Sequence, residues 1–341
     1  MKPAELPAPG PRAEAHEGPL TVAPWSQAGA SDVQALQQAR QQALLALGQG
    51  LAPVPCAVVH PCDAESLAGA LQAAAQGLIA LVLVGPQPRI EAVAAAAGLD
   101  IAAVPRVAAA HSHEAAALAA AMAAAGEVEG LMKGSLHTDE LMSAVLAQPG
   151  LRTKRRLSHV FRFDVPLYDK PLLITDAALN IRPTLLEKLD IVQNAIDLAH
   201  VLGCNCPRVA ILSAVETVNP AIPSTLDAAA LCKMADRGQI SGALLDGPLA
   251  FDNAISPEAV RIKGIASPVA GQADVLVVPD LESGNMLAKQ LQYLAGASAC
   301  GIVVGARVPI ALTSRADGPA ARVASALLLQ LLAHHYRQHR P

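Results

Sequence analysis

Short apolar runs without charged residues alternate with helix-like stretches along most of this chain of 341 residues. Such runs are typical of strands that are buried on both faces of a sheet. The stretches between them are long enough for helices that connect one parallel strand to the next. The alternation therefore predicts an α/β fold built from parallel βαβ units. The predicted strands are 56–59, 78–84, 101–104, 130–132, 159–163, 172–175, 209–212, 243–245, 275–278, 302–304 and 310–313.

A basic segment, 152–156 (RTKRR), separates two sets of predicted strands and indicates two α/β units. We interpret this segment as a solvated linker, with a binding patch as the alternative. Residues 1–30 contain many Pro, Ala and Gly without apolar periodicity, which predicts a flexible tail. Ser31-Asp32 is expected to cap the helix that follows. The last helix, 319–336, is expected to return to the first unit.

Composition excludes several classes of protein. Only 2% of the residues are aromatic and the formal net charge is −4. The chain therefore lacks both the aromatic side chains on which bases stack and the excess positive charge that would indicate a nucleic-acid partner. No run reaches the roughly 18 to 20 apolar residues that a membrane span needs. Residues 1–11 lack an apolar core, so no secretory signal is expected. Six cysteines without a C-x-x-C pair indicate reduced thiols, and we expect a cytoplasmic protein.

Polar residues follow several predicted strands, where the next helix begins. Ligands of open parallel sheets bind beyond the carboxyl ends of strands, and helix N-termini there attract anions. Lys133 and Gly134 follow one strand, and Thr138 is placed to cap the helix from Asp139. The lysine adds a positive charge and the glycine allows close backbone approach, so this junction could hold a phosphate. The alternative is a helix cap beside a solvated lysine.

The second and third junctions combine carboxylates with amides. Asp176 and Asn180 precede Pro183, the expected first residue of a helix, and either bind a ligand or shape a turn. Asp246 and Asn253 follow a buried strand together with one more aspartate. No histidine or third carboxylate stands at ligand spacing, so we predict no metal site, with Mg²⁺ as a weak alternative.

The fourth and fifth junctions carry smaller polar groups. Gly284 and Asn285 lie near the start of a predicted helix. Ser314 and Arg315 lie between the last strand and the last helix, which Pro319 should start. A hydroxyl, a guanidinium and free helical N–H groups together suit an oxyanion, although a plain cap would use the same residues.

Sequence signatures of other enzyme classes are missing. The chain has no G-x-S-x-G elbow, no G-x-G-x-x-G fingerprint and no Walker loop, which argues against a hydrolase, a nicotinamide enzyme and a P-loop enzyme. Its cysteines and histidines lack the paired spacing of a zinc site.

The five junctions, in this order, resemble those of the phosphate acetyl/butyryltransferase family. The matching stretches are 131–138 (LMKGSLHT), 173–180 (LITDAALN), 243–254 (ALLDGPLAFDNA), 277–287 (VVPDLESGNML) and 301–317 (GIVVGARVPIALTSRAD). Each is weakly specific alone, whereas the ordered set is specific. The DGPLAFDNA and SRAD segments are most similar to the butyryl-type branch and to the C-terminal part of bifunctional hydratase–phosphotransacetylases.

The resemblance implies the reaction acyl-CoA + phosphate ⇌ acyl phosphate + CoA, by direct attack in a ternary complex and without a metal or redox cofactor. It implies two α/β/α domains around a cleft, in the fold of isocitrate and isopropylmalate dehydrogenases, and a homodimer. The first domain would be discontinuous, with residues 31–160 and 306–341, and the second would comprise 161–305. Acyl-CoA and phosphate would be the partners, with no nucleic acid and no membrane.

The resemblance assigns catalysis to Ser314 and Arg315. Acetyl-type members place an aspartate, the assigned base, seven residues after this serine, where the present chain has Ala321. Asp317 is the candidate replacement as acid and base. Lys133, Thr138 and Asn285 are expected to line the phosphate side. The other candidate residues for phosphate or coenzyme A are Gly134, Asp176, Asn180, Asp246, Asn253 and Gly284.

Two other functions share parts of this pattern. Phosphotransacetylase-like domains fused to malic enzymes sense acyl-CoA and hold an oligomer together, so a non-catalytic acyl-CoA-binding module is the main alternative. Against it, the chain has no malic-enzyme part and keeps Ser314-Arg315. A decarboxylating dehydrogenase of the same fold would need a cluster of metal-binding aspartates at one strand end, which the sequence lacks.

Overall fold

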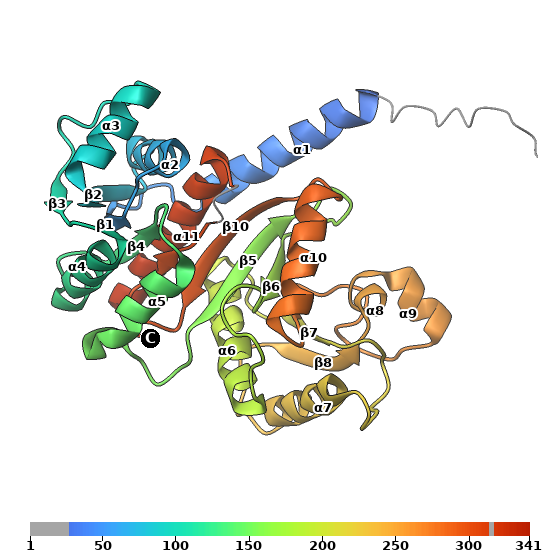
Figure 1. Cartoon of the computed structure of the whole chain (residues 1–341). Helices are drawn as coiled ribbons and strands as arrows, with labels where there is room; N and C mark the ends of the chain where they lie inside the picture. Colours follow the sequence, from blue (N-terminus) through green and yellow to red (C-terminus); the bar gives the residue numbers. More distant parts are fainter. Residues whose placement is uncertain (1–26, 314–316) are drawn as a thin grey trace, which may run out of the picture.

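The computed structural model describes residues 27–313 and 317–341, and the described strands form one continuous sheet (Figure 1). Its strand order is β3-β2-β1-β4-β11-β10-β5-β6-β9-β7-β8. The strands are β1 (Val54–Val59), β2 (Ile79–Gly85), β3 (Arg106–Ala108), β4 (Gly130–Lys133), β5 (Ser158–Asp164), β6 (Leu172–Thr175), β7 (Arg208–Leu212), β8 (Leu244–Leu249), β9 (Val275–Val277), β10 (Ser298–Val304) and β11 (Ile310–Ala311). The helices are α1 (Gln27–Ala46), α2 (Ala64–Ala75), α3 (Gln87–Ala97), α4 (Ser112–Ala125), α5 (Thr138–Ala147), the 3₁₀ turn η1 (Pro149–Leu151), α6 (Leu185–Val201), α7 (Pro223–Asp236), α8 (Phe251–Ile255), α9 (Pro257–Lys263), α10 (Leu281–Tyr293) and α11 (Pro319–Gln338).

Each end of the sheet is parallel, as the sequence predicts, but its centre is antiparallel. β1 pairs in parallel with β2 and β4, and β9 pairs in parallel with β6 and β7. β5 runs antiparallel to β6 and β10, and β10 runs antiparallel to β11. The connections from β5 to β6 and from β10 to β11 contain no helix and are too short for a parallel crossover. We call β1–β4 with β11 the first half of the sheet, and β5–β10 the second half.

Several predicted boundaries are wrong, and two of them have a clear physical reason. Residues 101–104 form a turn, closed by the Val104 N–H bond to Ile101 O at 3.1 Å, and the strand is Arg106–Ala108. This strand lies at the edge of the sheet and is partly exposed, so it needs no continuous apolar run. Helix α1 already includes residues 27–30, because Gln and Ala favour helix upstream of Ser31-Asp32. The rest of the predicted tail, 1–26, lies outside the described residues.

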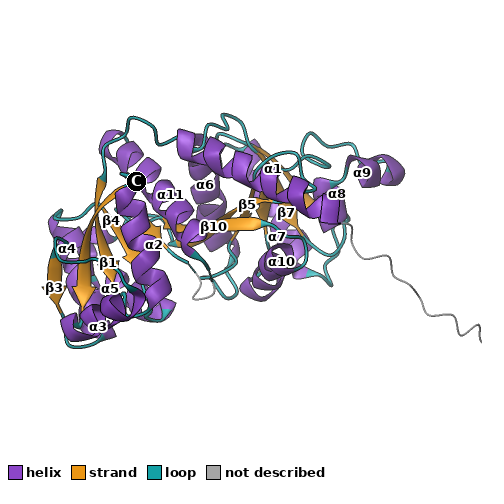
Figure 2. Ribbon diagram, turned by 90° about the horizontal axis from the view of Figure 1, so that it is seen from above, coloured by secondary structure: helices purple, strands orange, loops and turns teal. Residues whose placement is uncertain are grey.

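Helices cover both faces of the sheet, in the predicted α/β/α layers (Figure 2). One face packs on α2, α6, α7 and α11, through side chains such as Leu67, Ile196 and Leu328. The other face packs on α4 and α5 in the first half and on α10 in the second. Helix α11 returns to α2 in the first half, as predicted, and also contacts β10 and α6. Among the described helices, none has both the length and the apolar character that crossing a membrane requires.

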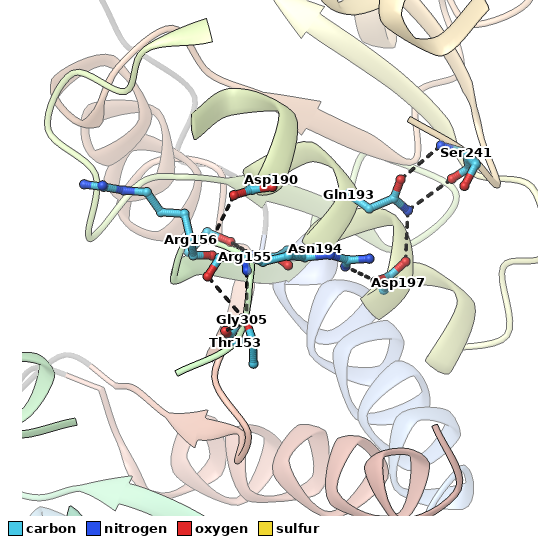
Figure 3. A network of polar contacts seen from close by, with 10 residues as sticks. Thr153, Arg155, Arg156, Asp190, Gln193, Asn194, Asp197, Ser241 and Gly305 are labelled. Atoms are coloured by element: carbon cyan, nitrogen blue, oxygen red, sulfur yellow. Dashed lines mark hydrogen bonds and ion pairs between the residues drawn. The ribbon is translucent and has the colours of Figure 1, made fainter. Parts of the chain in front are cut away.

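The segment between the two halves is anchored at several points (Figure 3). Thr153 Oγ1 donates to Gly305 O at 2.6 Å, which joins the two chain segments that connect the halves. The guanidinium of Arg155 pairs with Asp197 of α6. The basic segment 152–156 is therefore bound to the second half, and describing it as a solvated linker is incomplete.

Candidate active site

Three strands of the first half end side by side, and a helix starts close to each end. β4 lies between β1 and β11, and α2, α5 and α11 begin after these three strands. Asp63, His137 and Gly318 are the N-cap residues of the three helices. Thr138 is therefore the first residue of α5 and not its predicted cap. Free N–H groups and the helix dipole at such ends favour an anion. The carboxyl edge of the first half is therefore suited to a phosphate group.

Lys133 and Gly134 lie in the middle of this edge, at the end of β4. The Lys133 side chain is buried, and its Nζ lies 3.4 Å from the carbonyl oxygen of Gly134. A Cβ on Gly134 would lie 2.5 Å from Val59 O and 2.6 Å from His60 O, both at the end of β1. Only glycine fits this close approach, which holds the loop after β4 against the end of β1. Lys133 is thereby placed at the end of β4, between the ends of β1 and β11.

His60 and Ser135 form a pair at the same edge that the sequence did not single out. Ser135 Oγ donates to His60 O at 2.8 Å, so the His60 Nδ1, 3.0 Å from Oγ, carries the proton of the neutral ring. Burial lowers the pKa of His60, and the nearby Arg89 charge lowers it further. His60 also has a φ of 53°, in the left-handed region. The only sequence signal for this pair is the serine directly after Gly134.

Arg322 connects the start of α11 to the end of β11 and to α2. Its Nη1 donates to Thr313 Oγ1 at 2.7 Å, and its side chain occupies the space where a Cβ on Gly69 would lie. Burial lowers the pKa of Arg322, while the nearby carboxylates of Asp63 and Asp317 oppose that shift. Arg322 is thus a buried cation next to Asp317. A charged residue on an otherwise apolar helix face was the signal available in the sequence.

A cavity of about 460 Å³ lies between α1, α10 and the start of α11, and we call it the α11 cavity. Asp317 and Ala321 both line it. The predicted catalytic pair, Ser314 and Arg315, lies outside the described residues, directly before Asp317 in the chain. Asp317, the candidate acid and base, is thus one of the residues that line the α11 cavity.

Polar groups and a thiol also line the α11 cavity. Arg162 and Asp164 of β5 form an ion pair whose two side chains are more than nine-tenths buried. The thiol of Cys300 lies beside them, and burial raises its pKa to about 12. Cys300 is therefore a neutral thiol at physiological pH and not a ready nucleophile.

A second group of predicted residues gathers after β6. Asp176 and Asn180 are both buried, and the Asp176 carboxylate accepts four hydrogen bonds. Its donors are the backbone N–H groups of Ala178, Leu179 and Asn180 and the Nδ2 of Asn180. These bonds are those of a turn, so the geometry supports turn chemistry for Asp176. Pro183 precedes the N-cap Thr184, so its predicted place as first helical residue is wrong.

Gly284 and Asn285 pack the start of α10 onto this turn. Asn285 Nδ2 donates to Ala177 O at 3.2 Å. A Cβ on Gly284 would lie 2.6 Å from the Val278 side chain and 3.1 Å from Ala177 Cα. Gly284 and Asn285 therefore fix the loop after β6 against α10.

Asp246 and Asn253 lie apart from both groups. Asp246 is inside the edge strand β8 and does not follow it as predicted, because an edge strand tolerates the Gly-Pro that comes next. Asn253 is fully buried in α8 and donates to Glu216 Oε2 at 3.1 Å. Within residues 27–313 and 317–341, no three His, Cys, Asp or Glu side chains are grouped as a metal site would need.

The structure thus brings part of the predicted set together. Lys133, Gly134, Thr138 and Asp317 belong to the carboxyl edge of the first half, joined by His60, Ser135 and Arg322, which sequence reasoning missed. The residues Asp176, Asn180, Gly284 and Asn285 form the separate group in the second half. Phosphate chemistry is therefore best supported at the first group, where the buried cations and helix N-termini are.

Comparison with known proteins gives a family. Residues 103–329 match the family model described as phosphate acetyl/butaryl transferase. The phosphate acetyltransferase of Rickettsia prowazekii is 60% identical over 291 residues, which cover 85% of this chain and 83% of the relative. The phosphate butyryltransferase of Clostridium acetobutylicum is 40% identical over 278 residues, covering 81% of this chain and 92% of the relative.

A solved structure agrees with this assignment. The branched-chain phosphotransacylase from Enterococcus faecalis V583 aligns with a TM-score of 0.72 and 30% identity, covering 82% of this chain and 99% of that structure. The similarity extends across both halves of the sheet, and it confirms the family recognised from the five junctions. This chain belongs to the phosphate acetyl/butyryl transferase family.

Proposed function

We propose that this chain transfers an acyl group from coenzyme A to inorganic phosphate, giving an acyl phosphate and free coenzyme A. The observation that carries the proposal is the carboxyl edge of the first half, where the buried Lys133 ends β4 between β1 and β11, and where α2, α5 and α11 begin after these three strands. A dianion such as phosphate is the natural occupant of that edge. Family membership supplies the thioester as the second substrate.

The reaction needs positioning and charge stabilisation, without a covalent enzyme intermediate. A phosphate oxygen attacks the thioester carbonyl carbon, the C–S bond breaks, and the departing thiolate takes the proton that phosphate loses. Lys133 and the helix N-termini would hold phosphate oxygens, and by resemblance Arg315 and Ser314 would bind phosphate and the developing oxyanion. Fixed donors of this kind act most strongly in a site that excludes water. No oxidation occurs, so no redox cofactor is needed, and on the family resemblance we propose that the enzyme also works without a metal.

We also propose a cytoplasmic homodimer that prefers acetyl-CoA. Free cysteines, six in number, suit a reducing compartment. Met286, Tyr293 and Leu294 are exposed along α10, where a second copy of the chain could cover them. The preference for a short acyl chain is supported by the higher identity to phosphate acetyltransferases than to butyryltransferases.

A thiol-release assay tests the proposed reaction. The purified chain is given acetyl-, propionyl- or butyryl-CoA without metal, and free coenzyme A is followed with and without phosphate. We expect phosphate-dependent release with all three and the fastest release from acetyl-CoA. Binding of acyl-CoA without any release would instead indicate the non-catalytic acyl-CoA module.

Asp317→Asn should lower kcat by roughly 100-fold if Asp317 moves the proton between phosphate and thiolate. Asp317 and Ala321 line the same cavity, so a carboxylate introduced at position 321 could take over the proton transfer from Asp317. The matched double variant, Asp317→Asn with Ala321→Asp, should therefore recover part of the lost rate. The measurement is kcat at saturating substrates, and a single variant within twofold of the parent would assign proton transfer elsewhere.

A further inference from the structure

His159 is a fully buried histidine in the centre of the sheet that the proposed chemistry does not use. It belongs to β5, has no exposed surface, and packs edge-on against Phe161 with ring centroids 4.3 Å apart. Neither ring nitrogen has a hydrogen-bond partner of good geometry among the described residues. A neutral imidazole always carries one donor and one acceptor, and leaving both unpaired in the interior is costly. Such a group calls for an explanation.

Gly301 lets this imidazole cross from the second half toward the first. β10 lies between β5 and β11, and Gly301 is the residue of β10 over which the ring lies. A Cβ on Gly301 would lie 2.5 Å from His159 Nε2 and 2.7 Å from Leu312 O. The ring nitrogen and this carbonyl oxygen therefore both border the space that a side chain at position 301 would fill.

Leu312 is the first residue after β11, in a part of the sheet with few backbone bonds. β10 and β11 pair at only two positions, Ile302 with Ala311 and Val303 with Ile310. The Leu312 N–H adds one bond to Gly301 O at 3.2 Å. A side-chain contact to the Leu312 carbonyl would thus be a substantial addition to what holds the end of β11.

The surroundings of His159 keep its imidazole neutral, so one ring nitrogen carries a proton that it can donate. Burial lowers the pKa of His159 to about 4, although the nearby Asp176 carboxylate and the Leu312 carbonyl oppose this shift. Thr175 Oγ1 donates to the backbone oxygen of His159 at 2.9 Å and fixes the strand position. The ring is therefore neutral at physiological pH, with Leu312 O as the backbone acceptor that acts on it.

We propose that His159 is a positioning residue whose ring N–H donates to Leu312 O and so fixes the end of β11 against the second half of the sheet. The inference rests on the proposed function, because the segment that leaves β11 is the one to which the family resemblance assigns catalysis.

Three variants test the positioning role. His159→Leu removes the donor and keeps an apolar side chain, and we expect kcat to fall at least tenfold while KM for acetyl-CoA changes less than threefold. His159→Gln places an amide N–H near Nε2 and should keep kcat within threefold. Gly301→Ala puts a Cβ into the space of the ring and should resemble His159→Leu. Phe161→Leu, on the same face of β5, is the matched packing control and should lower the melting temperature without lowering kcat per folded molecule.

The outcomes separate this inference from the proposed function. Equal kcat in the parent and both His159 variants overturns the positioning role, and so do equal losses in His159→Leu and His159→Gln. An inactive parent protein would instead contradict the proposed function. Imidazole ¹⁵N–¹H spectra then decide about His159 independently: a ring proton protected from exchange at neutral pH, and absent in His159→Gln, supports the bond to Leu312. The lack of a protected ring proton overturns it, whatever the activity.

Discussion

Lys133→Met should lower kcat/KM for phosphate by roughly 100- to 1000-fold, which is the loss typical of removing one preorganised charge-stabilising group. The methionine keeps an unbranched side chain in the buried position at the end of β4, so the change removes charge more than volume. KM for acetyl-CoA should change little, because the thioester does not depend on this cation. Initial rates with phosphate varied at saturating acetyl-CoA measure the effect.

Lys170→Met is the matched control. Lys170 pairs with the Asp274 carboxylate and donates to Gln272 O at 2.6 Å, and it lies in the loop between β5 and β6 of the second half. We expect this variant to lose stability while its KM for phosphate stays at the parent value. An unchanged KM for phosphate in Lys133→Met would place the phosphate elsewhere than at the carboxyl edge of the first half.

Gly134→Ala should lower the free energy of unfolding by about 3 kcal/mol, at the upper end of what overpacking costs. The new Cβ would lie within 2.7 Å of three backbone atoms of Val59 and His60, which cannot turn away as a side chain can. The loop after β4 would have to move, so activity should fall together with stability. Urea unfolding and the thiol-release assay measure the two effects.

Gly150→Ala distinguishes this clash from the general effect of replacing a glycine. A Cβ on Gly150 would meet only ordinary contacts, the nearest being Ala124 Cβ at 3.5 Å. Its unfolding free energy should stay within about 0.5 kcal/mol of the parent. A Gly134→Ala variant as stable as Gly150→Ala would contradict the close packing of the β1 and β4 ends.

The strands and most helices could be predicted because buried parallel strands are uncharged apolar runs. The predicted strand 172–175 coincides with β6, and the predicted last helix, 319–336, ends two residues before α11 does. The edge strand β3 was missed because it is partly exposed and therefore lacks such a run. The antiparallel centre could not be predicted from the strands themselves, since direction depends on the short connections between them.

The candidate site was predictable only where its residues are neighbours in sequence. Lys133 and Gly134 directly follow a strand, so their place at the edge was visible. His60 and Arg322 are far apart in the chain, and each acquires its role because β1, β4 and β11 end together. Asp246 was misplaced because a Gly-Pro pair normally ends a strand, and only an edge strand such as β8 continues through it.

The position of β11 has a consequence for how the chain is made. β11 pairs with β4 at Ile310–Leu131, so the first half of the sheet needs residues that the ribosome supplies only after all strands of the second half. The strands of the second half are consecutive in the chain, from Ser158 to Val304, and can assemble earlier during synthesis. Until β11 and α11 emerge, the nascent first half exposes one edge of β4 and the apolar face of α2, which are surfaces that aggregate. We therefore expect the second half to be able to fold before the first, against the usual order in which N-terminal units fold first.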